Sequence, residues 1–180
     1  DSLMPFLRMA VGRVRFWTGL VILIPALLSY GLGRIDRARL KEIMLGHYIG
    51  GWETDRFQDA IEHYTKTALT ALCNGEAIAR ISWHRAQGHR VILISASPEA
   101  YLTPWAANHH IETVLATRLE ILDGTISGRI HGRNCRGVEK IERLSEYLQG
   151  LDGYEFHAYG DSVGDRELLA LATHAHYRPF

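Results

Sequence analysis

The sequence predicts an α/β protein in which a helical segment precedes a mostly parallel sheet. Residues 1–75 show helical patterns and no convincing strand pattern. From Gly88 onward, short apolar runs that suit buried strands alternate with amphipathic helices. Asp123-Gly124 adds a strong hairpin signal between two extended stretches. This order is typical of an open α/β sheet, in which ligands bind beyond the carboxyl ends of the strands.

Composition narrows the class of protein. The 180 residues are 47% apolar and 22% charged, which suits one globular domain or one domain with a small insertion. Lys plus Arg and Asp plus Glu both number 20, so there is no overall basic field, and we expect no nucleic-acid partner. The two cysteines, Cys73 and Cys135, are too few and too far apart for a disulfide framework or a Cys-rich zinc site. They suit a reducing compartment, and we expect a cytoplasmic protein.

An uncharged run over residues 16–33 is unusually apolar. Its 18 residues just reach the length of a membrane-span candidate, but Pro25 in the middle would break a soluble helix. We interpret the run as a pair of short buried or interfacial helices hinged near Pro25. A surface that touches membrane or lipid and a true span are the alternatives. Arginines flank both ends of the run: Arg13, Arg15, Arg34 and Arg37.

The remaining elements follow from periodicity and caps. Asn74 can cap a helix that Gly88 ends, and the VILI run at 91–94 indicates a strand buried on both faces. Further helices are expected over 34–48, 55–72 with Thr54 as N-cap, 75–87, 99–108, 138–149 and 165–172. Further strands are expected over 114–122, 125–130, 154–159 and 175–177.

The loop Gly160-Asp161-Ser162-Val163-Gly164-Asp165 is the strongest local feature. It places two carboxylates four residues apart, between a strand and a helix. Hard cations such as Mg²⁺ take one or two carboxylates plus water and phosphate oxygens. We expect the two glycines to let the backbone turn tightly. The structural alternative is a plain turn in which Asp165 caps the next helix.

Two further residues suggest an anion site. Ser95 directly follows the VILI strand, where a hydroxyl and backbone N–H groups can bind an anion. Lys140 lies in the first turn of the 138–149 helix, where the helix dipole disfavours a cation unless it faces an anion. The alternatives are a capping serine before Pro98 and a solvated surface lysine.

The order and spacing of these motifs resemble the haloacid dehalogenase (HAD) superfamily, in particular its phosphoserine-phosphatase-like subfamily IB. The likeness covers residues 88–180 and runs through SASPEAYLTPWA, ATRLEILDGTISGRI, GRNCRGVEK and YGDSVGDRELLALA. It implies a Rossmann-like core over 88–180 with a parallel sheet. It also implies that residues 1–87 form an inserted all-helical cap of the C1 type.

The resemblance implies an Mg²⁺-dependent phosphatase that hydrolyses phosphomonoesters through an aspartyl-phosphate. Ser95 and the N–H of Ala96 would bind the phosphoryl group, and Lys140 would neutralise its charge and hold the nucleophile. Asp161 would coordinate Mg²⁺, and Asp165 would support the metal site. The expected partner is a small-molecule phosphate ester, with lipid contact through 16–33 and a homodimer as open alternatives.

The sequence departs from the family pattern at two points. The Asp-x-Asp-x-Thr motif, which carries the nucleophile and the general acid, is absent, and Asp1-Ser2-Leu3 looks like the residues just after that motif. We therefore expect the first strand and its motif upstream of Asp1, and these 180 residues to be inactive alone. Gly164 stands where phosphoserine phosphatases carry Asn, which weakens phosphoserine as the substrate. A non-catalytic phospho-ligand-binding protein and a membrane-associated phosphatase acting on an amphiphilic phosphate are the alternatives.

Other chemistry is less well supported. The close histidine pairs, His109-His110 and His174-x-His176, lack the helical spacing or added cysteines of a zinc site, and we interpret them as surface or core histidines. A Gly-Asp-Ser esterase is disfavoured because no Asp-x-x-His follows the serine at 162. Cys135 has no clear histidine partner for nucleophilic catalysis.

Overall fold

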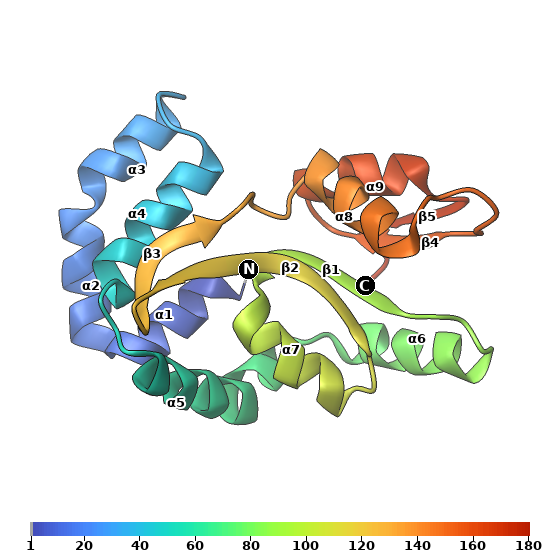
Figure 1. Ribbon diagram of the computed structural model, residues 1–180, viewed down its shortest axis with the longest axis horizontal. Helices are drawn as coiled ribbons and strands as arrows, with labels where there is room; N and C mark the ends of the chain where they lie inside the picture. Colours follow the sequence, from blue (N-terminus) through green and yellow to red (C-terminus); the bar gives the residue numbers. More distant parts are fainter. Residues whose placement is uncertain (1) are drawn as a thin grey trace.

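A computed structural model describes residues 2–180, and Asp1 lies outside the described residues. Helices occupy the first part of the chain, and strands and helices alternate after it, as the sequence predicts (Figure 1). The N-terminal helical segment contains α1 (Leu3–Val11), α2 (Arg13–Ile22), α3 (Ile24–Gly31), α4 (Arg37–Ile49), α5 (Thr54–Tyr64) and α6 (Gly75–Ala86). Short π and 3₁₀ turns, Thr65–Leu69 and Thr70–Leu72, continue α5 toward α6.

Local caps explain where several of these helices begin. The Asp36 side chain accepts a hydrogen bond from the Arg39 N–H at the start of α4. The Asn74 side chain does the same for Glu76 in α6, and Gly88 follows that helix with a φ of 75°. Both features of α6 confirm the sequence prediction. The expected single helix over 55–72 is instead α5 with an irregular last part.

The apolar run at 16–33 forms two short helices, as predicted. Helices α2 and α3 meet at Leu23 with a bend of 56°, two residues before Pro25, which is tolerated in the first turn of α3. Among residues 2–180 no unbroken helix has the length and apolarity to cross a bilayer, and only this bent pair passes by length and composition together. The run is buried only in part, because α3 contributes no buried side chain.

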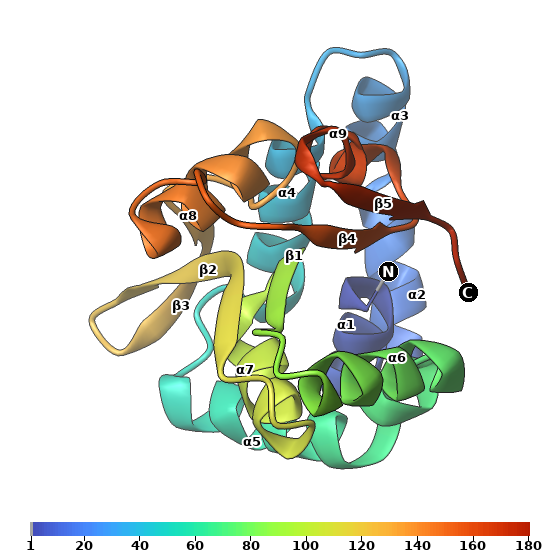
Figure 2. The ribbon, with the colours of Figure 1, turned by 90° about the vertical axis from the view of Figure 1, so that its right-hand side faces the viewer.

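The strands form two sheets rather than one. The first sheet holds β1 (Ile92–Pro98), β2 (Thr113–Leu122) and β3 (Thr125–His131) in that order, with β1 parallel and β3 antiparallel to β2. The second holds β4 (His157–Gly160) and β5 (His174–Tyr177), which are parallel. Helix α7 (Glu99–Asn108) connects β1 to β2, and α9 (Arg166–Leu171) connects β4 to β5. Helix α8 (Val138–Leu148) connects the first sheet to the second. The expected single parallel sheet is therefore divided in the described chain (Figure 2).

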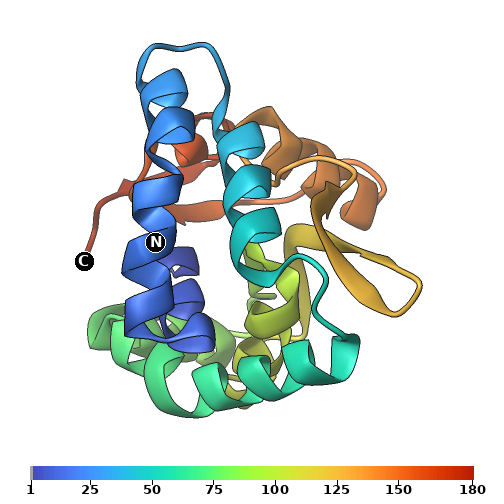
Figure 3. The ribbon, with the colours of Figure 1, turned by 90° about the vertical axis from the view of Figure 1, so that its left-hand side faces the viewer.

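The main core lies between the helical segment and the first sheet. It joins α1, α4, α5 and α7 to β2 and β3, and its centre is a cluster of rings from Phe6, Tyr64 and Tyr101, whose centroids are 5.2 to 5.3 Å apart. Figure 3 shows α3 and α4 side by side, with the loop between them at one tip of the molecule. Helix α4 packs on β3, and this contact fixes the helical segment against the sheet.

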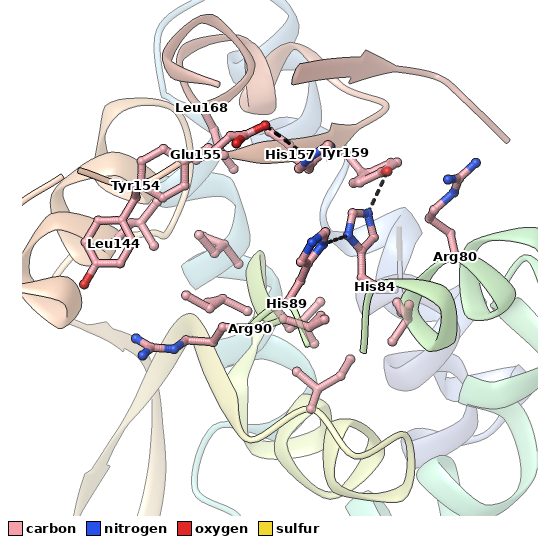
Figure 4. A pocket seen from close by; sticks show the side chains of 18 of the residues that line it. Arg80, His84, His89, Arg90, Leu144, Tyr154, Glu155, His157, Tyr159 and Leu168 are labelled. Atoms are coloured by element: carbon pink, nitrogen blue, oxygen red, sulfur yellow. Dashed lines mark hydrogen bonds and ion pairs between the residues drawn. The ribbon is translucent and has the colours of Figure 1, made fainter. Parts of the chain in front are cut away.

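An apolar groove separates the two sheets. The groove has a volume of about 670 Å³. One wall is formed by residues 91–94, at the start of β1, and the other by residues 154–159, which lead into β4 and form most of it. Side chains of α6, α8 and α9 complete the walls (Figure 4). The VILI run is accordingly half-buried, against the expectation of burial on both faces, because one edge of β1 borders the groove.

Candidate active site

Lys140 and Asp165 form a buried ion pair between α8 and the acidic loop. The Nζ atom of Lys140 lies 2.5 Å from Oδ1 of Asp165 and donates to the carbonyl oxygen of Ile94 at 3.1 Å. Each of the two residues is only 7% exposed. Lys140 is therefore not a solvated surface lysine. Its ammonium contacts the backbone of Ile94, the residue before Ser95 in β1. The anion that the lysine faces is the carboxylate of Asp165, in line with the prediction that Lys140 faces an anion.

The pKa of Asp165 is lowered by this arrangement. Burial acts to raise the pKa, but hydrogen bonds from Lys140 and from Ser162 outweigh it. The backbone N–H and the hydroxyl of Ser162 donate to Oδ2 of Asp165 at 3.0 and 2.7 Å. Asp165 precedes α9, but its side chain makes no cap to that helix. Its carboxylate instead holds Lys140 and the acidic loop together.

Gly160 allows this close packing because it has no Cβ. A Cβ built there would lie 2.5 Å from the Cβ of Asp165. Neither Gly160 nor Gly164 has a positive φ, so the expected tight turn is wrong as the reason for these glycines. Gly164 instead lies against the side chain of Arg136. The glycines are required by the close approach of side chains.

Asp161 differs from Asp165 in its surroundings. It is exposed at the carboxyl end of β4, and its backbone carbonyl accepts a hydrogen bond from Nε of Arg178 at 3.2 Å. Within residues 2–180 no hydrogen bond or ion pair engages its carboxylate. Of the two predicted metal-site carboxylates, only that of Asp161 is therefore open to a ligand.

Ser95 lies inside β1 rather than after it. It pairs with Ala116, and the strand register then shifts before Pro98, where β1 ends. The Ser95 hydroxyl accepts from the N–H of Ser97 at 3.1 Å, so it stabilises this irregular turn of the strand. Helix α7 has Pro98 at its N-cap position, and Ser95 does not cap it. Ser95 is half-buried, and it directly follows Ile94, whose carbonyl oxygen accepts the hydrogen bond from Lys140.

Lys41 of α4 reaches the same region, although the sequence alone does not single it out. Its Nζ donates to the carbonyl oxygen of Ala96 at 2.6 Å and to Oδ1 of Asn134 at 2.5 Å. Burial, followed by the positive charge of Arg37, lowers the pKa of Lys41 to about 8. No local signal marks this lysine, because only the packing of α4 on β3 brings it to β1.

Comparisons with known proteins agree with this fold. The family model of haloacid dehalogenase-like hydrolases matches residues 1–170. The protein CicA of Caulobacter vibrioides is 33% identical over 181 residues, covering 100% of this chain and 80% of CicA. The probable phosphatase Rv3661 of Mycobacterium tuberculosis is 28% identical over 145 residues, covering 79% of this chain and 49% of that protein.

Solved structures show the same architecture. A protein of unknown function from Bordetella pertussis superposes with a TM-score of 0.72 at 26% identity, covering 82% of this chain and 68% of that one. A probable phosphoserine phosphatase from Vibrio cholerae superposes with a TM-score of 0.64 at 15% identity, covering 83% of this chain and 45% of that one. The chain belongs to the haloacid dehalogenase-like hydrolase family, and its fold is that of the phosphoserine-phosphatase-like branch.

Proposed function

We propose that this protein is an Mg²⁺-dependent phosphatase that hydrolyses phosphomonoesters through an aspartyl-phosphate. The observation that carries the proposal is the buried Lys140–Asp165 pair, whose ammonium also donates to the carbonyl oxygen of Ile94, the residue before Ser95 in β1. A buried cation on α8, a serine in the strand that it contacts and an exposed carboxylate at Asp161 of the acidic loop are groups that suit the binding of a phosphoryl group. The name of the M. tuberculosis relative supports the same activity.

Each residue of the site has a distinct role in this reaction. The hydroxyl of Ser95 and the N–H of Ala96 bind phosphoryl oxygens, and Lys140 neutralises their charge. An aspartate carboxylate attacks phosphorus, the bond to the ester oxygen breaks, and a second aspartate protonates the leaving oxygen. Water then attacks the aspartyl-phosphate, which releases phosphate and restores the carboxylate. We assign both aspartates to a motif outside the 180 residues.

Asp161 and the acidic loop fit a magnesium ion. The Asp161 carboxylate is exposed and unengaged among the described residues, and a hard cation prefers such oxygen donors. Asp165 supports the site through Lys140 and Ser162 rather than by direct contact. When bound, Mg²⁺ would supply positive charge against the phosphoryl oxygens.

The groove between the sheets provides a place for the nucleophile. One edge of β1 and one edge of β4 border it, and its lining is largely apolar. A parallel strand inserted there would join the two sheets, because both sheets contribute parallel strands. Its carboxyl end would lie near Ser95 and Asp161. We therefore place the missing Asp-x-Asp motif at the end of a strand in this groove.

The decisive experiment compares two lengths of chain. We expect the 180-residue chain to release no phosphate from p-nitrophenyl phosphate with Mg²⁺. A chain extended upstream by an apolar strand ending in Asp-x-Asp-x-Thr should hydrolyse it, and the same chain with the first aspartate changed to Asn should not. If the longer natural chain releases no phosphate from any generic monoester, the phosphatase proposal is wrong. Phosphate binding without turnover would then favour the non-catalytic binding protein.

We assign substrate selection to the helical segment acting as a cap. Lys41 projects from α4 to the Ala96 carbonyl, so this segment contributes a charged group beside the proposed phosphoryl site. A phosphate ester that enters this site therefore meets residues of both parts of the chain.

An amphiphilic phosphate is a second candidate substrate, favoured by the exposed surface of α2 and α3. Nine large apolar residues around this bend are exposed: Val14, Trp17, Val21, Ile22, Ile24, Leu27, Leu28, Tyr30 and Leu32. Such a patch exceeds what isolated surface residues account for. It continues through a short loop into α4, which carries Arg37 and Lys41, so an apolar chain and its phosphate could be bound together (Figure 3).

Vesicle flotation tests this second candidate. We expect the chain to float with vesicles of phosphatidylcholine and phosphatidylglycerol. A variant with Ile22→Ser, Leu28→Ser and Leu32→Ser should stay in solution. A control, Ile121→Ser with Leu122→Ser, changes two exposed apolar residues on β2 and should float like the unchanged chain. Equal flotation of both variants would contradict the assignment of lipid contact to this surface.

A further inference from the structure

The second sheet carries a group of histidines that the proposed phosphatase chemistry does not use. Figure 4 shows His84 and His89 facing His157 and Tyr159 across the side of the groove. The Nδ1 atoms of His84 and His89 lie 2.8 Å apart, and Nε2 of His84 lies 2.9 Å from the Tyr159 hydroxyl. The ring of His89 stacks on that of His157, and the ring of His84 meets His157 edge-on, so three imidazoles lie together.

Strand geometry brings three donor groups of this face together. Glu155 and His157 are two residues apart, the spacing that places side chains on one face of an extended chain. His157 pairs with His174 of β5 in the parallel register. The two imidazole rings are stacked with centroids 4.3 Å apart. The residues at the start of β4 and of β5 therefore place one carboxylate and two imidazoles side by side.

The distances between the donor atoms suit one metal ion. Oε1 of Glu155 lies 2.7 Å from Nε2 of His174 and 4.0 Å from Nε2 of His157. One ligand atom from each of the three residues can be chosen so that all lie within 4.8 Å of one another. Tetrahedral zinc with bonds of about 2.1 Å needs donors roughly 3.4 Å apart. Binding would require Oε1 of Glu155 and Nε2 of His174, now 2.7 Å apart, to separate toward this spacing. We propose that Glu155, His157 and His174 bind a zinc ion.

The chemistry of the donors selects this class of metal. Two imidazoles and one carboxylate prefer zinc and related transition metals over Mg²⁺, which takes oxygen donors. Nε2 of His176 is shielded from solvent and has no hydrogen-bond partner among residues 2–180, so a further nitrogen lies on the same strand face.

Helical spacing is the wrong criterion for these histidines, which is why their sequence pattern does not predict a metal site. On paired strands the relevant spacing is two residues along one strand plus the register partner on the next. The structural consequence of binding is a link between β4 and β5. A two-stranded sheet is only marginally stable alone, so an ion bound across it would stabilise the pair.

Zinc titration of the untagged chain tests the proposal. We expect calorimetry to show one Zn²⁺ bound per chain in the presence of excess Mg²⁺, with a rise in the midpoint of thermal unfolding. His157→Ala and His174→Ala should each weaken zinc binding by about tenfold or more. His63→Ala, which removes an exposed histidine of α5, should bind like the unchanged chain.

Cobalt substitution tests whether a cysteine is among the ligands. The Co²⁺ complex should lack a thiolate-to-metal charge-transfer band, which separates this site from binding by Cys73 or Cys135. Circular dichroism of each variant establishes that it is folded. Failure of the folded chain to bind zinc, equal affinity in the histidine variants, or a thiolate band would each overturn the proposal. Phosphatase activity is not the readout, so this proposal and the phosphatase proposal fail independently.

Discussion

At the scale of single residues, the buried Lys140–Asp165 pair should dominate local stability. Removing one partner of a buried ion pair leaves an uncompensated charge, which typically costs about 3–5 kcal/mol. We expect Asp165→Asn to lower the free energy of unfolding by about that amount at pH 7. Denaturant titration measures it, with Asp152→Asn in an exposed loop as the control. Equal stability of the two variants would show that the pair contributes nothing.

The pH dependence of this contribution has a definite sign. The pKa of Asp165 in the folded chain lies below its ordinary value of 3.8. The stabilisation is therefore fully present above about pH 3.8 and is lost as the pH falls through the lower folded-state pKa. The stability difference between the unchanged chain and Asp165→Asn should accordingly persist at pH 5 and narrow in stronger acid.

Lys41 should make anion binding depend on pH near neutrality. With a pKa of about 8, its ammonium is charged below that pH and neutral above it. We expect Lys41→Met in the longer chain to weaken binding of inorganic phosphate about tenfold at pH 6.5 and little at pH 9.5, because a charge-assisted hydrogen bond contributes about 1.5–3 kcal/mol. Calorimetry at both pH values measures this. Lys66→Met, which changes an exposed lysine just after α5, is the control and should leave phosphate affinity unchanged at both pH values. A loss of affinity in Lys41→Met that does not depend on pH would contradict a charge effect.

At the scale of elements, the acidic loop depends on the missing Cβ of Gly160. Its added methyl group would lie 2.5 Å from the Cβ of Asp165, so the loop must shift. We expect Gly160→Ala to destabilise the chain by about 1–3 kcal/mol. Gly75→Ala, where a Cβ meets open space in α6, should be neutral or slightly stabilising. Thermal unfolding distinguishes the two, and a neutral Gly160→Ala would remove the packing argument.

Most elements set by local signals were predicted well, but Thr54 is the first residue of α5 and not its N-cap, which is Glu53. Asp123 and Gly124 both adopt positive φ, 48° and 74°, as the two central residues of a type I′ hairpin turn require. Asn74 caps α6, and α7 begins and ends at the predicted residues. The strand predicted over 154–159 is shorter than expected, because β4 begins only at His157. Tyr154 and Glu155 precede β4 and line the groove.

At the scale of the whole molecule, the groove between β1 and β4 should control how the sheets unfold. Within the described chain, β1 and β4 each pair with a strand on one side only. We expect hydrogen exchange to be fast at backbone amides of β1 and β4 that face the groove. In the chain extended by the nucleophile strand these amides should become protected, because they gain ladder partners. Amides between β2 and β3 serve as the control, and unchanged exchange at β1 and β4 would exclude a strand in the groove.

The sequence by itself determined the order of elements and most of the caps and turns, and it predicted which motifs carry the chemistry. The order, caps and turns follow from interactions within a few residues, and so do the positions of Lys140 and Asp165 relative to the strands, whereas Ser95 lies inside β1 and not directly after it. Only the tertiary structure decided that Lys140 is buried against Asp165, that Lys41 reaches Ala96, and that the strands form two sheets. It also decided which apolar side chains of 16–33 remain exposed and which histidines meet across β4 and β5. These depend on packing between segments far apart in the chain, and no local pattern encodes such contacts.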